Sequence, residues 1–132
     1  MIRWITALLI ASLVLVACGS NANAGDSAAG AVSAYINARN SASASDLQAL
    51  SCKAWESGAG DEANSFKSMS ARVSDLACQQ TGTDGQYTLV KCQGTLTTTY
   101  NGENRTRDLS TRLFRAAQES GSWKMCGYQG GS

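Results

Sequence analysis

The chain has 132 residues, with 11 lysines and arginines against 10 aspartates and glutamates, and it contains no histidine and no proline. A chain of this length forms one domain at most. The absence of histidine excludes Ser-His-Asp and Cys-His nucleophile arrangements and every histidine-containing metal site, because each needs an imidazole. A net charge of +1 gives no basic field that would hold phosphates, so the composition predicts no nucleic-acid partner.

The first residues predict an export signal. Arg3 supplies a positive charge, and an apolar run of about 13 residues follows from Trp4 to Val16. This run is shorter than the roughly 20 residues that a membrane-spanning helix needs, and no charged stop-transfer segment follows it. We therefore expect residues 1–17 to be a cleaved signal peptide. The alternative is a retained membrane anchor.

The apolar run ends in Leu15-Val16-Ala17-Cys18-Gly19. This pattern resembles the lipobox of bacterial lipoproteins. The resemblance implies cleavage before Cys18, diacylglycerol on the Cys18 thiol and an acylated new N-terminus. Two or three acyl chains hold a protein stably on a membrane, since each buried methylene contributes about 0.8 kcal/mol. The implied location is the cell envelope, on the outer side of the cytoplasmic membrane or, in Gram-negative cells, at the outer membrane.

Beyond Cys18, four cysteines remain in a chain with few large aliphatic residues: Cys52, Cys78, Cys92 and Cys126. A small core needs covalent support, and an even number of cysteines in an oxidising compartment predicts two disulfides. The alternatives are four free thiols or a zinc site. A zinc site is disfavoured because the chain has no C-x-x-C pair. We expect no metal and no cofactor.

A small polar segment, residues 18–26, is predicted to be the lipidated tether, which leaves residues 27–132 for the folded domain. The domain is expected to begin with a helix that Asp26 or Ser27 caps and that runs to about Arg39. Its apolar residues recur at the helical period and predict a face turned toward a core.

Two more helices are predicted next along the chain. Ser45 and Gln48 form a capping box that opens a short second helix. Gly58-Ala59-Gly60 is typical of a turn. Asp61 is then expected to start a third helix.

From Val73 onward, apolar and polar residues alternate with period two, which predicts an antiparallel meander of four strands. The strands are expected at residues 73–80, 86–100, 104–117 and 122–128. Asn101-Gly102 favours a two-residue type I′ turn, which sets Tyr100 opposite Glu103. The same register pairs Gly94 with Leu109, Cys92 with Thr111 and Val90 with Leu113.

One face of this sheet is expected to receive the helices. The apolar residues on that face are Leu76, Cys78, Val90, Cys92, Leu96, Leu109, Leu113, Trp123 and Met125. The predicted fold is therefore α+β, with three N-terminal helices packed on a curved four-stranded antiparallel meander.

The strand geometry also predicts which cysteines form pairs. A three-residue turn places Cys78 near Cys92 across the first hairpin, which leaves Cys52 to pair with Cys126. A bridge between Cys92 and Cys126 is disfavoured, since an intervening strand would hold their Cα atoms about 9.6 Å apart. Alternation in the last strand points Cys126 outward, so its bridge requires a bulge, a position at the sheet edge or a different register.

Three helices followed by a meander that ends in Gly121-Ser122-Trp123-Lys124-Met125-Cys126 resemble the small bacterial lipoproteins of the nuclear-transport-factor-2-like, cystatin-like superfamily. The resemblance covers about residues 27–128. In exported actinobacterial members, a cysteine after the second helix and one after the Trp-Lys pair recur, similar to Cys52 and Cys126. The fold implies a sheet curved around a helix and a conical cavity, which some relatives use for small apolar ligands or for catalysis.

No residue pattern predicts catalysis. Enzymes of this superfamily use an Asp or His base with tyrosine donors in an apolar pocket. The acids and tyrosines available show no spacing that singles out a pair: Asp46, Asp75, Asp108, Tyr35, Tyr87, Tyr100 and Tyr128. We therefore predict no catalytic residues.

Four arginines in the expected third strand suggest a site for an anion: Arg105, Arg107, Arg112 and Arg115. On a continuous strand, however, Arg112 points to the opposite face from the other three. Glu103 and Asp108 also lie close enough to offset their charge. The preferred interpretation is a set of solvated strand residues.

The leading hypothesis is a non-enzymatic binding or interaction module in the cell envelope, held on the membrane by lipid on Cys18. Its partner would be an envelope protein or a small ligand. One alternative is a carrier of a small apolar ligand or an enzyme that uses the cone. Another is a phage or prophage lipoprotein that blocks superinfection. A pocket above about 300 Å³ favours the carrier, whereas a filled core favours the interaction module.

Overall fold

The computed structural model describes residues 25–41 and 43–130. The predicted signal peptide, Cys18 and most of the tether therefore lie outside the described residues. Within the described ranges, no helix has the length and apolar character needed to cross a membrane.

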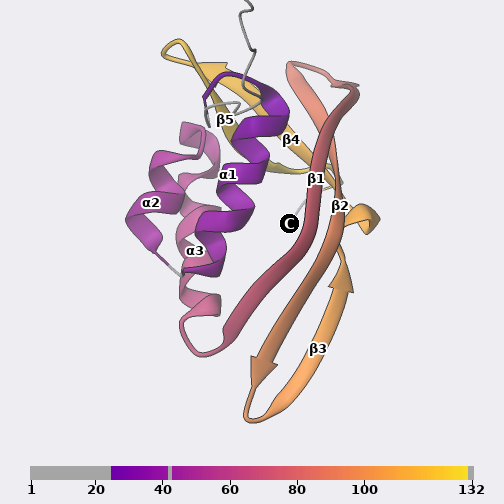
Figure 1. Cartoon of the computed structure of the whole chain (residues 1–132). Helices are drawn as coiled ribbons and strands as arrows, with labels where there is room; N and C mark the ends of the chain where they lie inside the picture. Colours follow the sequence, from indigo (N-terminus) through magenta and orange to yellow (C-terminus); the bar gives the residue numbers. More distant parts are fainter. Residues whose placement is uncertain (1–24, 42, 131–132) are drawn as a thin grey trace, which may run out of the picture.

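Helices pack on one side of a curved antiparallel sheet (Figure 1). The helices are α1 (Ala28–Asn40), α2 (Ala44–Ala49) and α3 (Glu56–Phe66), with a 3-10 helix at Lys53–Trp55 before α3. The strands are β1 (Ser70–Asp84), β2 (Tyr87–Tyr100), β3 (Glu103–Asp108), β4 (Leu113–Glu119) and β5 (Ser122–Tyr128). The strand order is β1-β2-β4-β5, and β3 pairs with β2. The α+β class and the curved antiparallel sheet are confirmed, but the sheet has five described strands rather than four.

The first helix begins where an N-cap was expected. Ser27 is the cap, because its Oγ accepts a hydrogen bond from the Gly30 N–H at 2.9 Å. The predicted apolar face is buried, and it includes Val32, Tyr35 and Ile36. This face packs against the sheet and contributes much of the core.

The next two helices do not begin where they were predicted. α2 is capped by Ser43, not by Ser45. α3 begins at Glu56 and runs through the segment Gly58-Ala59-Gly60, which was predicted to be a turn.

The reason for the early start of α3 is Trp55. Its ring lies so close to Gly58 that an added Cβ would be 2.6 Å from the indole. The indole therefore needs a residue without a side chain at this point of the helix. This packing outweighs the low helix propensity of glycine.

The predicted strand 104–117 is broken in two. The 3-10 turn Leu109–Thr111 separates β3 from β4. Asp108 caps this turn, because its carboxylate accepts hydrogen bonds from the N–H and Oγ of Ser110 at 2.8 and 2.7 Å. These bonds, the backbone one first, hold the pKa of Asp108 below its usual value.

The turn changes the register of the sheet. Tyr100 lies opposite Glu103 as predicted. Beyond the turn, Val90 lies opposite Phe114 instead of Leu113. The predicted pairing of Gly94 with Leu109 and of Cys92 with Thr111 is wrong, because the turn removes residues 109–111 from the ladder.

β1 and β2 are irregular at the same level of the sheet as the turn that separates β3 from β4. β1 shifts register between Ser74 and Ala77, and Asp75 has a φ of 57°. The facing residue, Gly94, has a φ of 130°, and a Cβ there would lie 2.8 Å from the Ser74 carbonyl oxygen. Only glycine fits this approach. Bulges of this kind bend and twist a sheet.

This level divides the molecule into two regions. The arm comprises residues 70–74, 95–100 and 103–108. The body comprises the helices with the remaining parts of β1 and β2, and with β4 and β5. In Figure 1 the arm runs past the helices, with β3 at its outer side.

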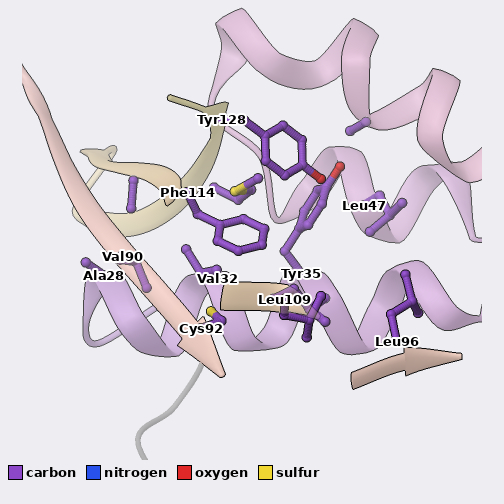
Figure 2. Packing of buried hydrophobic residues seen from close by; sticks show 14 of the residues in the cluster. Ala28, Val32, Tyr35, Leu47, Val90, Cys92, Leu96, Leu109, Phe114 and Tyr128 are labelled. Carbon is purple, nitrogen blue, oxygen red and sulfur yellow. The ribbon is translucent and has the colours of Figure 1, made fainter. Parts of the chain in front are cut away.

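The core lies between the helices and the inner face of the sheet, from the body to Leu96 at the base of the arm (Figure 2). Five of the predicted core residues are buried: Val90, Cys92, Leu96, Leu109 and Met125. Four others are only partly buried: Leu76, Cys78, Leu113 and Trp123. Phe114, which was not expected in the core, is buried because the shifted register turns it inward. Tyr128 is buried as well.

Both predicted cysteine pairs lie at disulfide distance. Cys78 faces Cys92 across β1 and β2, with a Cα separation of 4.0 Å. Cys52 and Cys126 have a Cα separation of 5.2 Å. The segment that contains Cys52 runs along β5, and its N–H donates to the Met125 carbonyl at 2.8 Å. This second pair therefore lies at the sheet edge, one of the arrangements that the sequence left open.

Candidate functional site

A polar network occupies the helix-facing side of the body. It comprises Tyr35, Arg39, Trp55, Glu62 and Tyr128. Tyr35 donates to Glu62 Oε2 at 3.1 Å, and Tyr128 donates to Glu62 Oε1. Arg39 Nη1 donates to the Tyr128 hydroxyl at 3.0 Å, and Trp55 Nε1 donates to the Tyr35 hydroxyl at 3.0 Å. Figure 2 shows the hydroxyls of Tyr35 and Tyr128 side by side.

The charges of this network balance. Arg39 Nη1 lies 3.6 Å from Glu62 Oε2, and the side chains are 8% and 20% exposed. Burial, followed by the charge of Glu62, raises the pKa of both Tyr35 and Tyr128 well above the usual value. Both phenols are therefore neutral donors at physiological pH. Within the described chain, Arg39 Nε has no hydrogen-bond partner, but the guanidinium lies 5.2 Å from the Phe66 ring centroid.

A cavity of about 370 Å³ opens beside the polar network. Its wall includes network residues from α1, α3 and β5. Phe66 and Leu96 supply apolar surface, while Arg107 and Arg112 supply positive charge. The Arg112 guanidinium lies 4.1 Å from the Tyr128 ring centroid.

A larger cavity of about 710 Å³ lies between the end of α3 and the inner face of the arm. Cross-strand neighbours form its sheet wall: Leu96 with Arg107, Thr98 with Arg105 and Tyr100 with Glu103. Phe66 and Met69 lie on the opposite wall. The two cavities share Ser65, Phe66, Leu96 and Arg107. We call the two together the groove.

The four strand arginines have different environments. Arg105 and Arg107 line the groove, and Arg112 joins them there. Arg115 instead forms an ion pair with Asp84 at 2.6 Å and lies over the Tyr87 ring. The predicted division, with Arg112 alone on its face, is wrong because the 3-10 turn at residues 109–111 interrupts the alternation.

The acids weighed from sequence do not gather in the groove. Asp46 and Asp75 are exposed on α2 and β1, and Asp108 caps the 3-10 turn. Tyr100 does reach the groove and is 54% exposed. The network acid, Glu62, was missed. Its sequence signal is weak: it lies one turn after the buried Ala59 and one turn before Phe66, on the same face of α3.

One group of potential metal ligands occurs in the described residues. The Sγ atoms of Cys52 and Cys126 and a carboxylate oxygen of Glu119 lie within 4.8 Å of one another. Both sulfurs belong to the cysteine pair at the sheet edge. Glu119 accepts a hydrogen bond from the Lys53 N–H at 3.0 Å. These contacts give the three residues a structural role.

No protein-family model matches the chain, and neither a curated protein nor a solved structure has significant similarity to it.

Proposed function

We propose that this protein is a lipid-anchored protein of the cell envelope, and that its α+β domain is a non-enzymatic binding module with the groove as its binding surface. The observation that carries this proposal is the groove itself, with cavities of about 370 and 710 Å³. Both exceed about 300 Å³ and so favour binding of a small ligand over a purely protein-interaction role. Ligand sites in proteins occupy about 300–1,000 Å³ and combine apolar walls with a few placed polar groups. The aromatic, aliphatic and arginine side chains of the groove fit that description.

The polar network supports binding rather than proton transfer. A general base must present an oxygen to the proton that it removes. Both carboxylate oxygens of Glu62 already accept a tyrosine hydroxyl, and Arg39 balances the charge. These contacts instead fix α1 and α3 against β5, which makes a rigid wall for the groove.

The point where the chain enters the domain supports anchoring with the arm turned outward. The Gly25 carbonyl accepts a hydrogen bond from the Trp123 N–H at 3.1 Å, so the tether joins the domain beside β5. In Figure 1 this end lies opposite the arm. The seven residues from Gly19 to Gly25 reach at most about 25 Å. With lipid on Cys18, the arm would be the part of the domain furthest from the membrane.

Lipid anchoring is tested by the substitution Cys18→Ser. We expect the wild-type protein to partition into the detergent phase and to carry a thioether-linked diacylglycerol by mass spectrometry. The variant should be unprocessed and should lack the added mass. A wild-type protein without lipid that still partitions into detergent would support the retained membrane anchor instead.

Binding in the groove is tested by filling it. Thr98 lines the larger cavity, whereas Thr97 lies on the other face of the same strand. We expect molecules extracted from purified wild-type protein to be found with Thr97→Trp and lost with Thr98→Trp. The same molecules in all three samples, or none in the wild type, would contradict the proposal. Chemical conversion of the bound molecule would favour an enzyme.

A further inference from the structure

We infer that the groove binds amphiphilic anions, with the apolar part of the ligand along the arm and its acidic head group at Arg107. This inference rests on the proposed function and names the ligand class. The head group is a carboxylate or a phosphate, which an arginine recognises through the same fork of N–H donors.

The apolar part of the site comprises Phe66 and Met69 on one wall and Leu96 and Tyr100 on the other. Among the described residues, Tyr100 is the one large hydrophobic side chain that is exposed, at 54%. Leu96 is 7% exposed and continues this surface toward the body. Covering an aromatic ring and its aliphatic neighbours removes apolar area from water, which favours an apolar ligand.

The charged part of the site centres on Arg107. This residue lies on the wall that the two cavities share, and it is exposed. Among the described residues, no carboxylate lies within 4.0 Å of it as an ion-pair partner. Its cross-strand neighbour is the buried Leu96, so charge and apolar surface adjoin as an amphiphile requires.

The acidic residues of the groove leave this position positive. Glu62 is neutralised by Arg39 within the polar network. Glu103 lies at the tip of the arm, 3.9 Å from Arg105. Asp61 is exposed at the smaller cavity, whose wall also holds Arg112. Glu103 faces Arg105 at the tip, so Arg107, on the wall that the two cavities share, is the charge that an acidic head group would meet.

Four probes with the same chain and different head groups test the inference: octanoate, octyl phosphate, octanol and octylammonium. Each is titrated calorimetrically into the full lipidated protein in zwitterionic nanodiscs, and the heat from empty discs is subtracted. Octanoate or octyl phosphate should bind at least about tenfold more tightly than octanol, because a hydrogen bond to a charged group is stronger than one to a neutral group. A preference between the two anions identifies the head group. Octylammonium should bind most weakly.

Two variants separate the parts of the site. Arg107→Gln should remove the preference for anions and leave octanol binding unchanged. Arg72→Gln is the matched control, since Arg72 is an exposed strand arginine on the opposite face of the sheet, beside Thr97. Tyr100→Ser should weaken all four probes alike.

Equal binding of all four probes, binding of none, or an anion preference that survives Arg107→Gln would overturn the inference. The proposed function is judged separately by the loss of native bound molecules in Thr98→Trp. A groove that loses those molecules but shows no anion preference would keep its binding function and have a different ligand class.

Discussion

The body and the arm share one sheet, but their polar side chains have different environments. In the body, helices cover the sheet, and Arg39 and Glu62 are held in a network of mutual hydrogen bonds. In the arm, every residue of β3 is exposed, and its ion pair, Arg105 with Glu103, is long and solvated. Arg39 and Glu62 in the covered region are committed to the fold, whereas the exposed Arg107 on the arm stays available to a ligand.

The boundary between the two regions is built into the backbone. Gly94 approaches the bulge of β1, and Asp108 caps the turn that ends β3. Past this level the sheet bends, and the helices cover the arm only at its base, where Leu96 is buried. The groove forms where the end of α3 faces the uncovered arm. The bend therefore creates the candidate site.

The largest expected effect concerns the cysteine pair that closes the body. Cys52–Cys126 spans 74 residues, whereas Cys78–Cys92 spans 14. The chain-entropy model predicts a stabilisation of about 4.5 kcal/mol for the longer loop and about 3 kcal/mol for the shorter. Replacing Cys52 and Cys126 with alanine should lower the melting temperature more than replacing Cys78 and Cys92.

Calorimetry on the two double variants measures this difference. Peptide mapping without reduction checks the pairing in the purified protein. Cys52 joined to Cys78 would refute the pairing. Four free thiols would refute it as well and would also remove the covalent advantage of the body over the arm.

The second effect compares a buried acid with an exposed one. Glu62→Ala leaves the Arg39 charge uncompensated and two tyrosine hydroxyls without their acceptor. We expect a loss of about 3 kcal/mol in the free energy of unfolding. Glu103→Ala is the matched control on the arm and should change it by no more than about 0.5 kcal/mol. Equal losses in urea unfolding would show that the network does not distinguish the two regions.

Much of the fold could be predicted because local signals agreed with tertiary packing. The face of α1 and the Asn101-Gly102 turn followed from periodicity and turn chemistry. The start of α3 could not, since glycine at position 58 serves the packing of Trp55. The break after Asp108 was also missed, because a capped 3-10 turn inside an alternating segment leaves the pattern nearly intact.

The candidate site was harder to predict than the fold. Glu62 carries no motif, and its partners Tyr35 and Tyr128 lie 27 and 66 residues away in sequence. The arginines were recognised as a group, but their faces depend on one short turn. Long-range contacts and a single break in register decide which side chains meet, and neither is encoded locally.

The third prediction uses pH to weaken the body alone. The folded-state pKa values of Tyr35 and Tyr128 are raised above the unfolded value of about 10. The contribution of each neutral phenol is therefore complete below about pH 10 and is lost as pH rises toward the folded pKa. The unfolding free energy should fall there by about 1.4 kcal/mol per pH unit for each tyrosine.

Urea unfolding between about pH 8 and 11 measures this slope. Tyr35→Phe should reduce it, because one of the two buried phenols is removed. Tyr100→Phe serves as the control, since that ring is exposed on the arm and is not one of the network residues. A slope unchanged by Tyr35→Phe would contradict the prediction.

The smallest expected effect is a difference in stability loss between variants of two arginines that the sequence pattern places on the same strand face. Arg115 makes two hydrogen bonds to Asp84 Oδ2, at 2.9 and 2.6 Å, and its side chain is 28% exposed. The side chain of Arg105 is 79% exposed, and its distance to Glu103 is 3.9 Å. A well-formed, partly buried pair contributes more than a long solvated one, so Arg115→Ala should cost about 1 kcal/mol and Arg105→Ala no more than about 0.5 kcal/mol. Chemical denaturation measures both losses. The contribution of the ion pair itself is isolated by comparing Arg115→Ala, Asp84→Ala and the variant that carries both substitutions. If the Arg115→Ala and Asp84→Ala losses simply add in the double variant, the ion pair contributes nothing, and this contrast between body and arm disappears.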